Sequence, residues 1–113
     1  MVYLVGGYKL TEAEARAWGK ARSIDPPEYT VMAMVNEWLE AAKIPTSILA
    51  CTYDGRDIFL FVTHRKNDLY ATYTNFPQFT ENEHALEVKG RLQLDSKVQF
   101  VTVTGAYIQW GID

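Results

Sequence analysis

Residues 47–65 constrain the fold more than any other stretch, because they predict a β-hairpin with apolar side chains on both faces. Asp54-Gly55 separates two runs rich in β-branched and aromatic residues. Asp-Gly is typical of tight hairpin turns, since glycine adopts positive φ without a steric penalty. One face is expected to carry Leu49, Cys51, Ile58, Leu60 and Val62, and the other Ile48, Ala50, Phe59 and Phe61. A hairpin with one solvated face would alternate apolar with polar residues, so both faces of this one must be covered.

The remaining elements follow from capping signals and from the spacing of apolar residues. Capping boxes that open at Thr11 and at Thr80 predict two helices, the second ending at Gly90. Asp25-Pro26 and the apolar spacing that follows predict a further helix as far as Lys43. Strands are predicted at residues 2–5, 69–75, 92–94, 98–104 and 107–110, in addition to the hairpin.

This gives the order β-α-α-β-β-β-α-β-β for a single domain spanning residues 1–113. Strand runs joined by hairpin-length connections predict an α+β fold, in which an antiparallel sheet carries the helices on one face. A chain this short has no obvious layer for the other face. The sequence therefore predicts a homodimer, with Ile48, Phe59 and Phe61 as candidate interface residues.

Composition excludes several classes of function. The chain is 48% hydrophobic and 22% charged and has a net charge of -3, so it lacks the basic footprint of a nucleic-acid-binding protein. No stretch is long and apolar enough to span a bilayer, and no signal peptide is evident. We expect a cytoplasmic protein that does not bind membranes. Secretion without a signal peptide stays open.

The chemistry-bearing residues predict neither a catalytic site nor a metal site. One cysteine and two histidines cannot form a zinc-finger pattern, so no metal or cofactor is expected. Cys51 should lie opposite Ile58 or Leu60 in the hairpin, out of reach of His64. Its neighbours are apolar, which predicts a core thiol rather than a nucleophile. Gly6-Gly7 lacks the remaining residues of known phosphate-binding motifs.

Aromatic clustering is the remaining functional signal. The candidate binding residues are Tyr70, Tyr73, Phe76, Phe79, Tyr107 and Trp110. Aromatic residues favour interfaces and ligand pockets. The leading hypothesis is a small non-enzymatic binding protein, acting through this surface and forming a homodimer. The alternative is a small enzyme or ligand carrier with a pocket between sheet and helices, whose polar residues would come from His64, His84, Asp57, Tyr73 and Tyr107.

Overall fold

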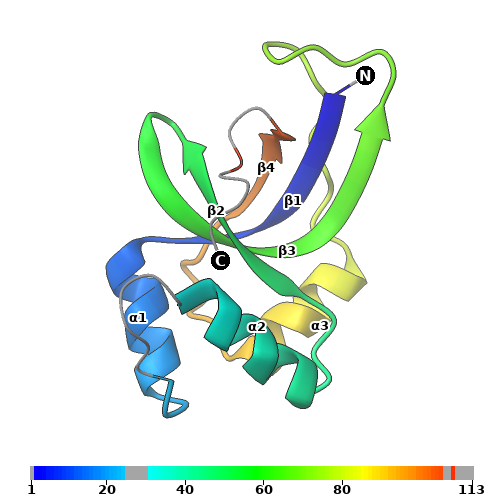
Figure 1. The fold of residues 1–113 in the computed structure, drawn as a ribbon. Helices are drawn as coiled ribbons and strands as arrows, with labels where there is room; N and C mark the ends of the chain where they lie inside the picture. The colour runs from blue at the N-terminus through cyan, green and yellow to red at the C-terminus, as the bar shows by residue number, and fades with distance from the viewer. Residues whose placement is uncertain (1, 25–30, 106–107, 109–113) are drawn as a thin grey trace.

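The computed structural model describes residues 2–24, 31–105 and 108, which form three helices and four strands. In chain order the elements are β1 (Val2–Leu10), α1 (Glu12–Lys20), α2 (Val31–Ala41), β2 (Ser47–Tyr53), β3 (Arg56–Asp68), α3 (Glu83–Leu92) and β4 (Phe100–Thr104). The strands form one antiparallel sheet in the order β2-β3-β1-β4 (Figure 1). The predicted α+β class is confirmed.

The β2–β3 hairpin has the predicted register. Leu49 pairs with Leu60 and Cys51 with Ile58, so the two apolar sets lie on opposite faces. The turn places Asp54 at φ 52° and Gly55 at φ 74°, two successive left-handed residues as expected of a primed turn.

β1 is longer than the sequence predicts, because its two glycines continue the strand instead of ending it. Gly6 pairs with His64 and Gly7 with Val62, so β3 is bulged between these pairs. A Cβ on Gly7 would lie 1.9 Å from the Phe61 carbonyl oxygen. A side chain at that position would therefore prevent the close pairing of β1 and β3.

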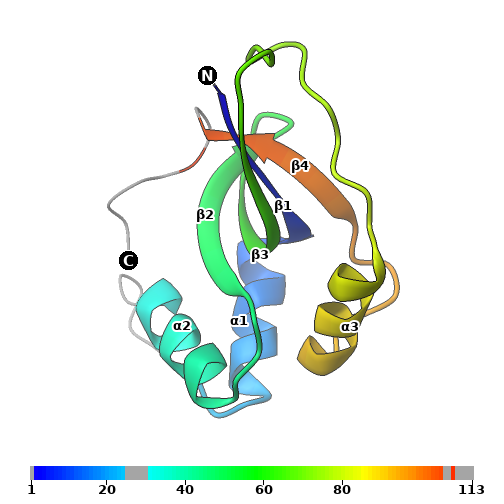
Figure 2. The same ribbon diagram turned by 90° about the vertical axis from the view of Figure 1, so that its right-hand side faces the viewer.

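All three helices cover the same face of the sheet (Figure 2). The core between helices and sheet consists of Tyr8, Leu10, Ala15, Trp18, Ile24, Met32, Val35, Leu39, Ile44, Ile48, Ala50, Phe61, Ala85, Val88 and Leu92. Asn36 of α2 also covers the free edge of β2, where its amide accepts from the Ile48 nitrogen at 2.8 Å and donates to the Ile48 oxygen at 3.3 Å. These bonds satisfy backbone groups that an edge strand would leave open.

The other face of the sheet is covered by the chain itself. The sheet curls, and its second core consists of Val5, Cys51, Ile58, Leu60, Val62, Val101, Val103 and Ile108. An isolated antiparallel bridge joins Cys51 of β2 to Ile108, which follows β4. Residues from the two edge strands of the sheet therefore meet in one apolar cluster.

This closure removes the reason for which a second subunit was predicted. Ile48 and Phe61 are buried beneath the helices, and Phe59 is half-buried against the same core. These candidate interface residues already have partners within the chain. The homodimer itself stays a prediction, but the two-sided hairpin no longer requires it.

Two of the predicted strands are absent. Residues 69–75 form bends and irregular backbone instead of a strand. Residues 92–94 are not a strand either, because Leu92 is the last residue of α3 and Gln93 caps that helix. Gln93 has the left-handed conformation typical of a helix end, at φ 57°. Gly90, predicted to end this helix, lies inside it. Of the predicted last strand at 107–110 only Ile108 is described, and the Asp25-Pro26 cap also lies outside the described residues.

The helix starts differ in how well they were predicted. Thr11 and Glu14 form the complete capping box that the sequence predicts for α1. The second helix start is displaced by two residues, because Asn82 rather than Thr80 caps α3 by accepting from the Ala85 nitrogen at 3.0 Å.

Candidate functional site

One connecting segment, residues 69–82, carries most of the predicted binding residues. It leaves the sheet after Asp68, the last residue of β3, and ends at the Asn82 cap of α3. In Figure 1 it projects beyond the ends of β1 and β3 and then returns along the sheet to α3. Its first part, residues 69–75, is called the aromatic loop below, and its second part, residues 76–82, the return segment.

Asp68 fixes the start of the aromatic loop. Its carboxylate accepts hydrogen bonds from the Tyr70 nitrogen at 2.9 Å and the Ala71 nitrogen at 3.0 Å. Lys66 lies 3.4 Å from the other carboxylate oxygen. The amide of Tyr70 contributes most to lowering the pKa of Asp68 below its usual value, which burial partly opposes. Asp at this position favours a turn over a continued strand because its side chain bonds the backbone that follows.

A second set of bonds closes the tip of the loop. The Thr72 nitrogen donates to the Asn75 oxygen at 2.9 Å, and the Asn75 nitrogen donates to the Thr72 hydroxyl at 3.0 Å. The backbone between Asp68 and Asn75 is therefore held at both ends.

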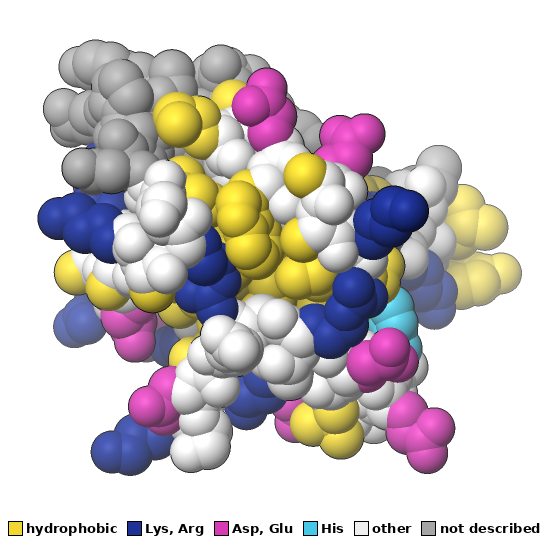
Figure 3. Space-filling view, turned by 90° about the horizontal axis from the view of Figure 1, so that it is seen from below, with side chains coloured by type: hydrophobic (Ala, Val, Ile, Leu, Met, Phe, Trp, Pro, Cys, Tyr) yellow, Lys and Arg dark blue, Asp and Glu magenta, His cyan; other side chains and the backbone are white. Residues whose placement is uncertain are grey.

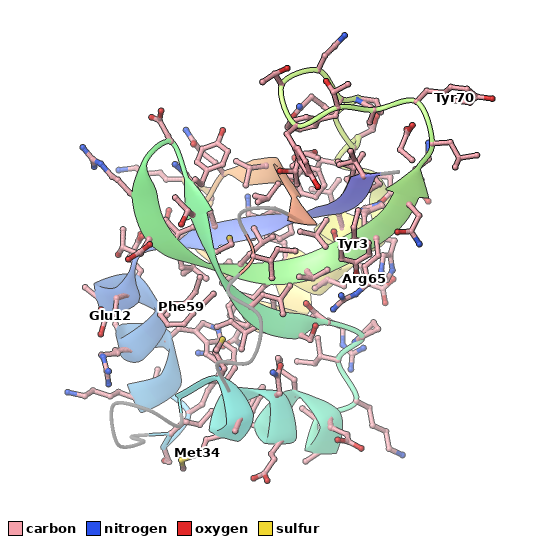
Figure 4. All side chains as sticks on the ribbon, turned by 45° about the horizontal axis from the view of Figure 1, so that its top comes forward. Tyr3, Glu12, Met34, Phe59, Arg65 and Tyr70 are labelled. Atoms are coloured by element: carbon pink, nitrogen blue, oxygen red, sulfur yellow. The ribbon has the colours of Figure 1, made fainter. Side chains whose placement is uncertain are left out.

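The apolar side chains of this loop point to solvent. Tyr70 is 92% exposed, Leu69 69% and Tyr73 55%. Figure 4 shows Tyr70 extending away from the sheet at the end of β3. In the described part of the chain, the other exposed large hydrophobic side chains are Met34 on α2 and Leu86 on α3. Three of these five exposed side chains, Leu69, Tyr70 and Tyr73, therefore lie together in the aromatic loop.

The return segment packs on the sheet. The Phe79 ring lies over Gly6, where an added Cβ would come within 2.6 Å of the ring. The same ring lies 5.2 Å from the ring of His64, and the Phe79 nitrogen donates to the Thr102 hydroxyl at 2.9 Å. Phe79 therefore anchors the return segment to β1, β3 and β4 together.

The two histidines, twenty positions apart in sequence, meet beside this anchor. The ring centroids of His64 and His84 are 6.2 Å apart, and His64 shares a hydrogen bond of 2.7 Å with the Thr63 hydroxyl. Burial, followed by the charge of His84, lowers the pKa of His64, and a hydrogen bond to Asn82 acts in the opposite direction. Glu81 accepts a hydrogen bond from the Tyr8 hydroxyl at 2.7 Å. Burial, followed by this hydrogen bond and by the charge of Glu81, raises the pKa of Tyr8.

Two of the other polar candidates, Asp57 and Tyr73, lie on other parts of the chain, and Tyr107 lies outside the described residues. Asp57 lies at the β2–β3 turn, where it accepts from the Thr52 hydroxyl at 3.3 Å, and Tyr73 lies in the aromatic loop. Among the described residues no three His, Cys, Asp or Glu side chains form a group able to hold a metal ion.

Cys51 has the environment of a core residue. It is fully buried between the strands, and burial raises its pKa to about 11. A thiol of this kind is almost entirely protonated near neutral pH and is a poor nucleophile.

The helical side of the molecule carries Lys and Arg side chains around an apolar patch (Figure 3). Two of the cations on this side, Arg22 in the turn after α1 and Arg91 on α3, are used within the fold. Arg22 donates to the carbonyl oxygens of Trp18 and Leu92, and Arg91 donates to that of Ala42. These guanidinium groups satisfy the carbonyl ends of helices, a structural role.

The six predicted binding residues therefore separate into three groups. Tyr70 and Tyr73 are exposed on the aromatic loop, whereas Phe76 and Phe79 are half-buried in the return segment. Tyr107 and Trp110 lie outside the described residues. Sequence reasoning missed Leu69 and the role of Asp68. The available signal was an Asp at the end of a strand, directly before two large apolar residues.

None of the described helices is long and apolar enough to cross a membrane. No protein family matches the chain, and neither a curated protein nor a solved structure resembles it significantly.

Proposed function

We propose that this protein is a non-enzymatic binding protein that contacts a protein partner through the aromatic loop. The observation that carries the proposal is the exposure of Leu69, Tyr70 and Tyr73 on a loop whose backbone is hydrogen-bonded at both ends. Large apolar groups on a surface cost free energy in water unless a partner covers them.

The bonding of the loop supports binding rather than accidental exposure. Tyrosine contributes a large contact area with few rotatable bonds, which makes it frequent among the energetically dominant residues of interfaces. A loop already fixed by Asp68 and by the Thr72–Asn75 turn loses less conformational entropy on binding than a free one.

The predicted homodimer is consistent with this surface. Both faces of the sheet are covered within the chain, so a second copy would use the aromatic loop instead of Ile48, Phe59 or Phe61. The enzyme or carrier alternative has weaker support, because Asp57 lies at the β2–β3 turn, seven positions along β3 from His64, and Tyr73 lies in the aromatic loop.

The test compares a loop variant with a variant that loses an exposed apolar side chain elsewhere. Tyr70→Ser/Tyr73→Ser removes the exposed aromatics, and Leu86→Ser, at a side chain 52% exposed on α3, is the control. Light scattering measures self-association of the purified proteins, and affinity capture from lysate of the source organism measures binding to other proteins.

We expect the double variant to lose the dimer or the captured partner, and Leu86→Ser to retain it, with all three proteins equally folded by circular dichroism. Equal association and equal capture by the wild type and the double variant would contradict the proposal.

A further inference from the structure

We propose that a second site, separate from the aromatic loop, binds a small, uncharged and mainly apolar molecule. The site is a pocket of about 420 Å³ between the β2–β3 turn and β4. It is lined by Thr52, Tyr53, Asp54, Gly55, Phe76, Thr102, Val103 and Thr104. This inference does not depend on the proposed protein partner.

The pocket follows from the curl of the sheet. β4 lies at one edge of the sheet and β2 at the other, yet the Cys51–Ile108 bridge shows that the chain brings their ends together. The β2–β3 turn consequently faces β4, and Phe76 of the return segment closes a further side. A volume of this size lies within the usual range for small-molecule sites.

The walls define the class of ligand. Tyr53, Phe76 and Val103 offer apolar surface, and the Thr52 hydroxyl on the rim already donates to Asp57. Among the lining residues that the structure describes, Asp54 is the one with a charged side chain. Its carboxylate disfavours an anionic ligand. The pocket therefore suits a neutral molecule with a flat apolar body.

The hydroxyl groups of the β4 threonines are not available to a ligand. Thr104 is 1% exposed, and its hydroxyl oxygen, which has no hydrogen-bond partner in the described part of the chain, is closed off from solvent. Thr102 is engaged by the Phe79 nitrogen. The apolar walls and Asp54, rather than a hydroxyl group, therefore determine which ligand the pocket accepts.

The test uses two dyes that differ in one charged group. N-phenyl-1-naphthylamine is neutral, largely apolar and has a single N–H donor. 8-Anilino-1-naphthalenesulfonate has the same ring framework with an added sulfonate. Fluorescence titration of the folded protein should show saturable 1:1 binding of the neutral dye, and at least about fivefold weaker binding of the sulfonate because of Asp54.

Two variants locate the dye. Thr52→Phe fills the pocket from its half-exposed rim and should abolish binding, whereas Thr80→Phe, an exposed position outside the lining, should leave it unchanged. Asp54→Asn removes the carboxylate at a position whose left-handed φ of 52° asparagine also adopts, and should bring the affinity for the sulfonate to within about twofold of that for the neutral dye.

Three outcomes would overturn the proposal: no saturable binding of the neutral dye, equal affinity of the wild type for both dyes, or affinity for the neutral dye unchanged in Thr52→Phe. If Thr52→Phe fails to give a native near-ultraviolet spectrum, Asp54→Asn decides the question, because an unchanged difference in affinity between the two dyes would overturn the proposal.

Discussion

The contact between Phe79 and Gly6 holds the return segment on the sheet, and a double-mutant cycle measures it directly. The Phe79 side chain is half-buried, so Phe79→Ala should cost about 2 kcal/mol, roughly half the cost of truncating a fully buried phenylalanine. Gly6 has no positive φ, so alanine is compatible with its backbone. A Cβ there would nevertheless lie 2.6 Å from the Phe79 ring edge and 3.1 Å from Cβ and Cγ of Phe79.

Gly6→Ala alone should therefore destabilise the protein by about 1–3 kcal/mol, the usual cost of forcing an extra methyl group into a packed site. In the Phe79→Ala background the clashing ring is gone, so the same substitution should cost close to nothing. The expected coupling is about 1–3 kcal/mol, well above the roughly 0.5 kcal/mol scatter of independent sites.

Urea unfolding of the wild type, the two single variants and the double variant gives all four free energies. Additive costs would show that Phe79 does not lie over Gly6, and the account of how the return segment is anchored would then be wrong. Gly7→Ala is the control, because its clash is with the Phe61 carbonyl and should persist in either background.

Three further predictions concern single residues. The pKa of His64 is lowered, so the folded state binds a proton at His64 less readily than the unfolded chain does. The free energy of unfolding should therefore fall as the pH drops below about 6.5. His64→Gln should reduce the loss of free energy of unfolding measured between pH 7 and pH 5, and an unchanged loss would refute this prediction. Gly90→Ala should raise the free energy of unfolding by about 0.5–1 kcal/mol, because a Cβ inside α3 meets no atom within 4 Å; destabilisation in urea would contradict it. Cys51 should resist a thiol reagent at pH 8 until the protein is unfolded, and rapid labelling of the native protein would disprove its burial.

Local signals predicted the parts of the fold that depend on neighbouring residues. Asp54-Gly55 determines the hairpin turn, and the alternation on each side of it determines the register, so both apolar faces were predicted correctly. The Thr11–Glu14 capping box is equally local and is present as predicted.

The errors concern residues whose conformation depends on distant partners. Gly6-Gly7 resembles a strand end, but these glycines are needed inside β1 because Phe79 and the Phe61 carbonyl approach them closely. Residues 69–75 have the composition of a strand, yet Asp68 turns the chain away, and none of the described strands pairs with them.

The cover of the second sheet face could not be predicted for the same reason. It depends on the curl of the sheet, which brings Ile108 to Cys51 across more than fifty positions of sequence. Of the candidate site, the exposed Tyr70 and Tyr73 were predicted from composition. The pocket beside Thr104 combines three separate segments and had no sequence signal.

The central claim is that the aromatic loop, rather than a sheet or helix face, is the surface that binds a protein partner. Site-specific photo-crosslinking tests it most directly, with benzoylphenylalanine placed at position 70, 86 or 34 in otherwise wild-type protein. All three positions have exposed side chains, but only Tyr70 lies in the loop. The account predicts a crosslinked species, either a second copy or another protein, from position 70 and none from positions 86 and 34. A partner crosslinked from position 86 or 34, but not from position 70, would contradict it.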